Sequence, residues 1–232
     1  MGSPLPAYRR LPLVKYAVLI DGGFIRRKLG TQEHPLTFEG VMDFLEELKG
    51  HEALSGFALH RIYWYDAPPL DRMAQRPLKG GRVNFGATAL ARASRALFRK
   101  LSKIPHLSLR RGDLVFRGWR VRRGRLPENG SAVTLTADDL EPHIQQKGVD
   151  MRIGLDIAAL AMKGHANVIV LVAGDSDFVP AMKFARREGA QIFLVTLGHV
   201  VREEMLEHAD LRLELTQSEA ATKRERQPVR AA

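Results

Sequence analysis

The sequence predicts one α/β domain of three layers, in which helices cover both faces of a central parallel sheet. Apolar runs that read as strands alternate along the chain with segments of helical spacing. The apolar runs are nearly continuous, as in parallel strands that are buried on both faces. A length of 232 residues suits one sizeable core with an insertion better than two domains.

The first two strands and their connection lie near the start of the chain. "KYAVLIDGGF" predicts a buried strand from Tyr16 to Ile20. "FALHRIYWYDAPP" predicts the second strand, which Pro68 and Pro69 end. Between them apolar residues recur at helical spacing, which predicts a crossover helix on Phe38, Val41, Met42, Leu45 and Leu48.

A basic helix and a basic ribbon are expected in the middle of the chain. From Thr88 to Lys103 one helix face is apolar, on Leu90, Ala93, Leu97 and Leu101, and another is basic, on Arg92, Arg95, Arg99 and Lys103. "HLSLRRGDLVFRGWRVRRGRL" alternates apolar and basic residues around three glycines, which predicts a β-hairpin or ribbon. The expected insertion spans about residues 105–135 and ends in the turn-rich "PENGSAVTL".

The last part of the chain predicts two further strands with their helices. "GVDMRIGLDIAALAMKG" is helical, "NVIVLVA" is a strand, and "FVPAMKFARREG" is a helix that Gly189 stops. "QIFLVTL" is a strand, and a short helix follows around Val201–His208. We expect an N-terminal extension over 1–14, the domain over 15–214 and a disordered polar tail over 215–232.

Positive charge is concentrated in one segment of the chain. The net charge is +10, and the segment Arg95–Arg125 alone has eleven Arg or Lys residues against one acid, Asp113. Such a segment favours a polyanion partner, because neutralising phosphates releases counterions; the alternative is a solvated basic face. Phe98, Phe116 and Trp119 are interleaved with the charges and could stack on bases. The expected RNA-binding residues are Arg95, Arg99, Lys103, Arg117, Trp119, Arg120, Arg122 and Arg123.

Aspartates follow two of the predicted strands at the point where each strand ends. Asp21 comes directly after Tyr16–Ile20, and Asp175 and Asp177 follow Val168–Val172. The carboxyl ends of the strands form the binding crevice of an open parallel sheet. These three side chains are therefore expected at one edge of the sheet.

Asp150 is expected to join them from the start of the next helix. At about 100° per residue it shares a face with Gly154, Ile157 and Ala161, and we expect that face to pack on the sheet. Asp156 falls on the other side of the helix, so it is expected to be a surface or salt-bridged residue.

A divalent cation would relieve the repulsion among four such carboxylates. The chain has no cysteine, so any metal is held by oxygen or imidazole, and an oxygen-only set suits Mg²⁺ or Mn²⁺. Two ions roughly 4 Å apart would activate a water and stabilise the leaving oxygen of a phosphodiester. The alternative is that Asp177 only caps a helix and Asp175 only serves a turn. The convergence of the acids favours the metal site.

Three motifs resemble the NYN domains of the LabA-like branch of the PIN-like nuclease superfamily. They are "VLIDGGFIRRKL", "KGVDMRIGLDIAALA" and "VIVLVAGDSDFVPAMKFARREGAQIFLVTLG", in the order that the family has them. The resemblance implies a PIN-like, Rossmann-like α/β/α fold and metal-dependent ribonuclease chemistry. It places the acidic positions of the family on Asp21, Asp150, Asp175 and Asp177, and the Lys of its Lys-Gly-x-Asp motif on Lys147.

Two positions differ from what the family or the helix face implies. The family often keeps an acid at the position of Asp156, which the helix-face argument places outside the site. Many NYN domains have an Asn three residues after the first Asp, where this chain has Phe24, and this puts the level of activity in question. Lys147 either flanks its helix as a surface charge or contacts a carboxylate or phosphate, and both interpretations stay open.

Other classes of site find little support. The eight histidines have no ligand spacing, no Gly-x-Ser-x-Gly elbow surrounds Ser176, and no phosphate-binding glycine loop for triphosphates or dinucleotides occurs. No run approaches the roughly 18 apolar residues of a spanning helix, and "MGSPLPAYRRLPL" is too short for a secretory signal, so we expect a cytoplasmic protein without a membrane partner. A homodimer stays open.

Three functions are compatible with the sequence. The first is an Mg²⁺- or Mn²⁺-dependent endoribonuclease, and the second is an RNA-binding or regulatory protein that uses the same acids weakly or not at all. The third is a Toprim-like phosphotransfer domain, whose usual Glu after the first strand is Asp21 here. The resemblance favours the ribonuclease.

Overall fold

The computed structural model describes residues 13–31, 33–126, 130 and 132–216. Most of the expected N-terminal extension and of the expected tail therefore lies outside the described residues. The tip of the predicted basic insertion, at 127–129 and 131, lies outside them as well.

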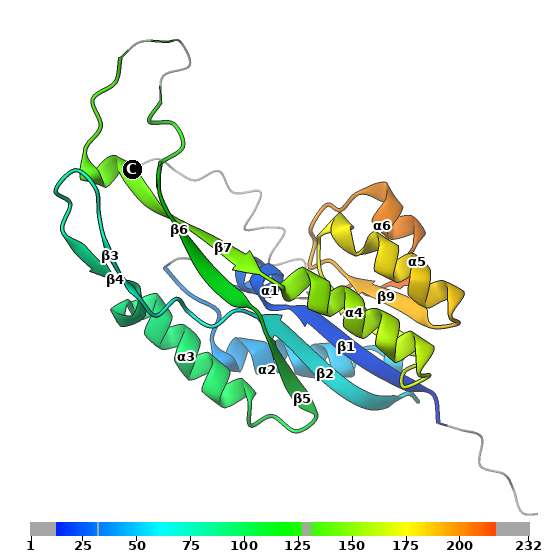
Figure 1. The fold of residues 1–232 in the computed structure, drawn as a ribbon. Helices are drawn as coiled ribbons and strands as arrows, with labels where there is room; N and C mark the ends of the chain where they lie inside the picture. The colour runs from blue at the N-terminus through cyan, green and yellow to red at the C-terminus, as the bar shows by residue number, and fades with distance from the viewer. Residues whose placement is uncertain (1–12, 32, 127–129, 131, 217–232) are drawn as a thin grey trace, which may run out of the picture.

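A parallel sheet of six strands forms the centre of the molecule, in the order β10-β9-β8-β1-β2-β5 (Figure 1). The strands are β1 (Lys15–Asp21), β2 (Ala58–Asp66), β5 (Leu107–Arg111), β8 (Val168–Val172), β9 (Gln191–Val195) and β10 (Leu211–Arg212). Every neighbouring pair is parallel. All six carboxyl ends therefore lie at one edge of the sheet, and the three-layer α/β prediction is confirmed.

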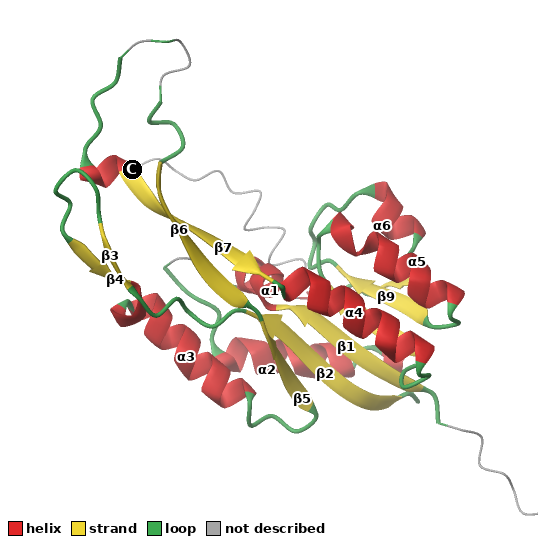
Figure 2. Cartoon of the chain, viewed as in Figure 1, coloured by secondary structure: helices red, strands yellow, loops and turns green. Residues whose placement is uncertain are grey.

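Helices cover both faces of this sheet (Figure 2). Alternation along β1 sends Tyr16, Val18 and Ile20 to one apolar core and Ala17 and Leu19 to the other. The first core is closed by α1 (Gly22–Leu29), α2 (Phe38–Lys49) and α3 (Ala89–Leu101). The second is closed by α4 (Val149–Met162), α5 (Val179–Arg187) and α6 (Glu203–Glu207).

Side-chain caps begin the helices that the sequence predicted. Thr37 accepts a hydrogen bond from the Gly40 amide at 3.1 Å at the start of α2, and Thr88 accepts one from Ala91 at 3.1 Å at the start of α3. Single 3₁₀ turns lie in the connections, at η1 (Glu52–Leu54), η2 (Phe85–Ala87), η3 (Ala137–Asp139) and η4 (Ser176–Phe178). No helix among the described residues combines the length and the apolar character needed to cross a membrane.

The basic ribbon differs from the predicted one in its strand pairing. β6 (Asp113–Val121) pairs antiparallel with β7 (Leu140–Lys147), and a bulge at Gly118 interrupts the ladder. The prediction of a hairpin within His106–Leu126 was wrong, because β5 belongs to the central sheet and a single residue, Gly112, separates it from β6. We call the β6–β7 pair the ribbon; it leads away from the carboxyl edge of the sheet (Figure 1).

A small hairpin packs against one face of the ribbon. It consists of β3 (Met73–Gln75) and β4 (Arg82–Asn84). The rings of Phe85, Phe116 and Trp119 lie 5.3–6.2 Å apart, and the Trp119 indole donates to the Gln75 carbonyl at 2.9 Å. This aromatic cluster joins the hairpin to the ribbon, so the other ribbon face is left to its arginines.

Candidate acidic site

The four predicted acids lie at the carboxyl edge of the sheet. Asp21 ends β1, and Asp175 and Asp177 follow β8, which is the neighbour of β1 in the sheet. Asp150 lies in the first turn of α4. Gly148 makes the turn from β7 into that helix with a φ of 74°, a conformation that favours glycine. We call Asp21, Asp150, Asp175 and Asp177 the acidic cluster.

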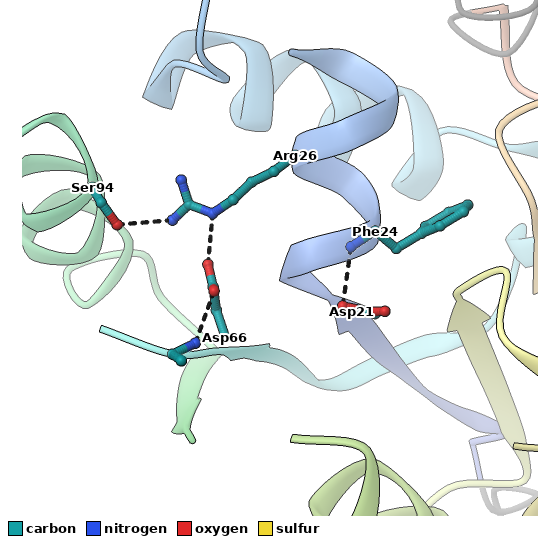
Figure 3. Close-up of polar contacts among 6 residues, drawn as sticks. Asp21, Phe24, Arg26, Asp66 and Ser94 are labelled. Atoms are coloured by element: carbon teal, nitrogen blue, oxygen red, sulfur yellow. Dashed lines mark hydrogen bonds and ion pairs between the residues drawn. The ribbon is translucent and has the colours of Figure 1, made fainter. Parts of the chain in front are cut away.

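Asp21 is the buried member of the cluster, with a relative exposure of 8%. Its Oδ1 accepts a hydrogen bond from the Phe24 amide at 3.0 Å and so caps α1 (Figure 3). Burial raises the pKa of Asp21 above its ordinary value, and the charge of Asp150 adds to this rise. The Phe24 amide and the Arg27 guanidinium act in the opposite direction without cancelling it.

The other three carboxylates interact across the gap between β8 and α4. Partial burial, and then the charges of Asp175 and Asp177, raise the pKa of Asp150 above its ordinary value. Asp175 also accepts a hydrogen bond from the Asp177 amide at 3.0 Å and caps η4. The alternative gave the cap to Asp177 and a turn to Asp175, but it is Asp175 that caps, and α5 begins without a side-chain cap. A cap uses only Oδ1 of Asp175. The carboxylates repel one another through space while two of them cap helices.

The donor set of the cluster fits a hard cation that keeps much of its water. All four side chains offer oxygen, as Mg²⁺ and Mn²⁺ prefer. Within residues 13–31, 33–126, 130 and 132–216, no three His, Asp or Glu side chains are gathered closely enough to hold a metal ion by themselves. One or two carboxylates supplemented by water and substrate oxygens are a common arrangement for Mg²⁺. The residues therefore fit a water-rich ion better than a closed protein cage.

A cavity of about 470 Å³ opens beside the cluster. Asp21 and Asp175 line it, and so do the positive side chains of Arg27, Lys28 and Arg202. His199 and the loop before α6 complete the wall. Carboxylates and cations thus face the same space, an arrangement that suits a phosphate held partly through a metal ion. We call this space the site cavity.

Phe24 forms an apolar part of the site cavity, where the resemblance would place an Asn. Its ring is 3% exposed and lies 5.9 Å from the ring of His199. A Cβ at Gly174 would come within 2.7 Å of the Phe24 ring and 2.6 Å of His199 Cδ2, so only glycine fits between β8 and the two rings. Phe24 therefore shapes the cavity and offers no polar contact.

Asp156 is directed away from the acidic cluster. It accepts a hydrogen bond from the Tyr65 hydroxyl at 2.7 Å and pairs with Arg110 at 2.9 Å. Burial and this carboxylate together raise the pKa of Tyr65. The structure thus agrees with the salt-bridged interpretation of Asp156. Lys147 is exposed at the base of the ribbon, opposite Asp113 and three residues before Asp150.

Two residues near the site were not among the predicted ones. Asp66 ends β2 and is 5% exposed; it pairs with Arg26 at 2.7 Å and accepts from the Ala67 amide at 2.8 Å (Figure 3). It meets the same rule of an acid at a strand end, so the sequence did contain the signal. Gln146 approaches the site from the ribbon: its Oε1 is 4.0 Å from the position of a Cβ on Gly23, which is itself 3.2 Å from Asp21 Oδ1.

The predicted RNA-binding residues of α3 divide into two kinds. Arg95 donates to the Gly86 carbonyl at 3.0 Å, and Arg92 donates to the Ala87 carbonyl at 2.5 Å, so both hold the turn before the helix. Arg99 and Lys103 are exposed. The basic stripe of the helix is therefore shorter than the sequence suggested.

Two arginines of β6 are matched by polar side chains of β7, one of them an acid. Arg120 pairs with Glu141 at 2.7 Å, and Arg117 donates to Gln145 at 3.3 Å. Arg122 and Arg123 are exposed. Trp119 is half-buried in the aromatic cluster, with the Arg76 guanidinium 5.7 Å from its ring, and Phe98 is 6% exposed. The count of charge along the chain overestimates the charge of the surface.

The comparisons with known proteins point to one family. The model of the NYN domain family matches residues 117–213, which is 97 of the 232 residues. The match includes Asp150, Asp175 and Asp177 and begins after Asp21. No curated protein matches the chain. A crystal structure of a protein of unknown function from Vibrio parahaemolyticus RIMD 2210633 aligns with 12% identity and a TM-score of 0.44, over 87% of this chain and 94% of that one.

Proposed function

We propose that this protein is a metal-dependent endoribonuclease of the NYN type, with Mg²⁺ or Mn²⁺ as its cofactor. RNA phosphodiester bonds are hydrolysed at the acidic cluster of Asp21, Asp150, Asp175 and Asp177. The observation that carries the proposal is the electrostatic interaction of these four side chains at the carboxyl edge of a parallel sheet. The match to the NYN domain model supports it, since PIN-like nucleases form the wider group of that domain. We also propose that the protein belongs to the LabA-like branch of the NYN-domain proteins.

The residues of the chain have separate tasks in this reaction. A bound divalent cation would supply an activated water and would neutralise charge on the leaving oxygen. Asp150, Asp175 and Asp177 supply oxygen donors, and their mutual repulsion favours uptake of a cation. Asp21, whose pKa is raised by burial, can take the proton of the attacking water.

The cationic wall of the site cavity positions the substrate. Arg27 is close enough to lower the pKa of Asp21, and Arg202 lines the same cavity. Both can hold non-bridging phosphate oxygens, for which arginine has the matching geometry. Lys147 and the exposed Arg122 and Arg123 extend the positive path along the ribbon. The expected setting is the cytoplasm.

A second candidate is an RNA-binding or regulatory protein without strong catalysis. Two observations favour it: Phe24 stands where a polar residue would be expected, and the acids of the described residues do not form a complete ligand set. Both functions predict RNA binding. They differ in what happens when metal is added.

Cleavage of a labelled RNA pool separates the two functions. The wild type is incubated with Mg²⁺, with Mn²⁺ or with EDTA, and Asp175→Asn and Asp43→Asn are compared under the same conditions. Asp43 is an exposed aspartate of α2, on the face of the sheet opposite α4, and serves as the matched control. The proposal expects metal-dependent products from the wild type and the control only. RNA binding without cleavage in every condition would establish the second candidate instead.

A further inference from the structure

An apolar groove of about 510 Å³ lies between the end of β2, the start of α3 and the base of the ribbon. The ribbon side is formed by Leu114, Pro142 and Ile144, and the opposite side by Leu70, Phe85 and Leu90. Leu90 is 63% exposed although it lies in the first turn of a helix, where the sequence predicts a core position. Apolar walls and an exposed leucine indicate that this groove is suited to a ligand with an apolar, flat surface.

The groove ends at the acidic cluster. Gly23 and Gln146 line its inner end, and the Cβ position of Gly23 is 3.2 Å from Asp21 Oδ1 and 4.0 Å from Gln146 Oε1. A ligand that fills the groove would therefore lie against the start of α1, and Asp21 borders the site cavity two residues before Gly23. The two spaces are separated only by the first turn of α1.

Cations border the groove at this end. Arg26 lies on its floor, paired with Asp66 and hydrogen-bonded to Ser94 (Figure 3). Arg27 follows in the chain and lines the site cavity. An apolar groove next to a cationic and carboxylate-lined cavity matches the two parts of a nucleotide, which are a flat base and a charged phosphate.

We infer that this groove takes one unstacked nucleobase of a single-stranded RNA whose phosphate lies in the site cavity. The inference rests on the proposed function and adds to it a reason for strand selectivity. In a duplex the bases are stacked and paired, so their faces cannot enter a groove, whereas a single strand can turn a base outward. Apolar contact with a base face is tolerant of sequence, and the Gln146 amide can both donate and accept at the edge of any base.

The test measures the contribution of the base apart from that of the phosphate. Binding is measured in Ca²⁺ buffer with two oligomers of equal length, a single-stranded RNA and an abasic ribose-phosphate strand. A base held by apolar contact contributes roughly 5- to 100-fold in affinity. The wild type should prefer the RNA by a factor in that range, because both oligomers meet the same cations.

Leu90→Asn tests the groove, and Leu155→Asn is its matched control. Both leucines lie on helices and are 63% exposed, but Leu155 is on α4, on the other side of the sheet. Leu90→Asn should weaken RNA binding by about fivefold, which corresponds to roughly 40 Å² of apolar contact. It should leave the abasic strand unaffected, because no charge changes. Leu155→Asn should bind both oligomers as the wild type does.

Three results would overturn the inference, and only the last of them would also overturn the proposed function. Equal affinity of the wild type for the two oligomers, or RNA binding by Leu90→Asn that matches the control, would show that no base occupies the groove and would leave the ribonuclease standing. Failure of the wild type to bind either oligomer would remove the ribonuclease proposal and the groove together.

Discussion

Replacing Asp175 by Asn removes one negative charge from the acidic cluster while it preserves the local structure. Asn accepts the amide hydrogen bond of a cap about as well as Asp does, so η4 keeps its start. The charge that disappears is one of the two that raise the pKa of Asp150. In metal-free buffer the substitution is therefore expected to stabilise the folded protein.

The size of this stabilisation is limited by solvent. Asp175 is exposed, and interactions between exposed charges typically contribute about 1 kcal/mol or less. For a chain of this size, 1 kcal/mol corresponds to a rise in melting temperature of about 2–4 °C. Added metal should reverse the order of stability of the wild type and Asp175→Asn. A cation at 100 times its Kd stabilises the wild type by about 2.7 kcal/mol, or roughly 5–10 °C, and should stabilise the variant much less.

Thermal unfolding followed by circular dichroism measures both effects. Wild type, Asp175→Asn and the control Asp43→Asn are unfolded in EDTA and in saturating Mn²⁺. We expect the variant to melt slightly above the wild type in EDTA and below it in Mn²⁺. The reasoning would be refuted if Mn²⁺ raised all three melting temperatures equally, because the cation would then bind elsewhere.

Three further outcomes are expected. The pKa values of Asp21 and Asp150 are raised in the folded state, so the folded protein binds protons more tightly than the unfolded chain, and the free energy of unfolding falls as pH rises above 3.8 through the folded pKa values. In urea titrations across this pH range, Asp21→Asn should make the fall smaller. A profile identical to that of the wild type would contradict this reasoning. Gly174→Ala should lower the free energy of unfolding by about 1–3 kcal/mol, because its Cβ would overlap Phe24 and His199; a melting temperature equal to that of the wild type would be evidence against such tight packing. Changing Arg122 and Arg123 together to Ala should reduce the slope of log affinity for single-stranded RNA against log salt by about 1.4, whereas a slope that stays the same would place the phosphates elsewhere.

The central fold could be predicted from the sequence because its signals are local. Apolar runs such as Tyr16–Ile20 and Val168–Val172 are buried on both faces, and amphipathic segments separate them. Since the strands of the central sheet are parallel, their carboxyl ends share an edge. This rule predicts Asp21 and Asp175 at one edge, and the structure adds that their strands are neighbours.

The ribbon could not be predicted in the same way. Its second strand, "LEPHIQQK", is polar and contains Pro142, so neither alternation nor β-propensity marks it as a strand. Its partner strand β6 ends at Val121, and β7 begins 19 residues later at Leu140. Pairing at that distance depends on the aromatic cluster and on the hairpin beneath it, which no local pattern reveals.

The sequence alone does not show which charges have a partner within the fold. Asp66 fits the strand-end rule, and its ion pair with Arg26 holds α1 against β2. Arg120 belongs to the basic ribbon, and Glu141 on the facing strand pairs with it. A charge is assigned to a partner only when the fold is known, because the partner lies far away in the sequence.

The central claim is that the acids form one metal-dependent site for RNA cleavage. Single-turnover cleavage of a labelled single-stranded RNA in Mn²⁺ tests it most directly, with Asp21→Asn, Asp150→Asn and the double variant. If one site uses both carboxylates, each single change abolishes most of the rate and the double variant is little worse than either. Losses that multiply in the double variant, or single variants that cut as fast as the wild type, would contradict the claim.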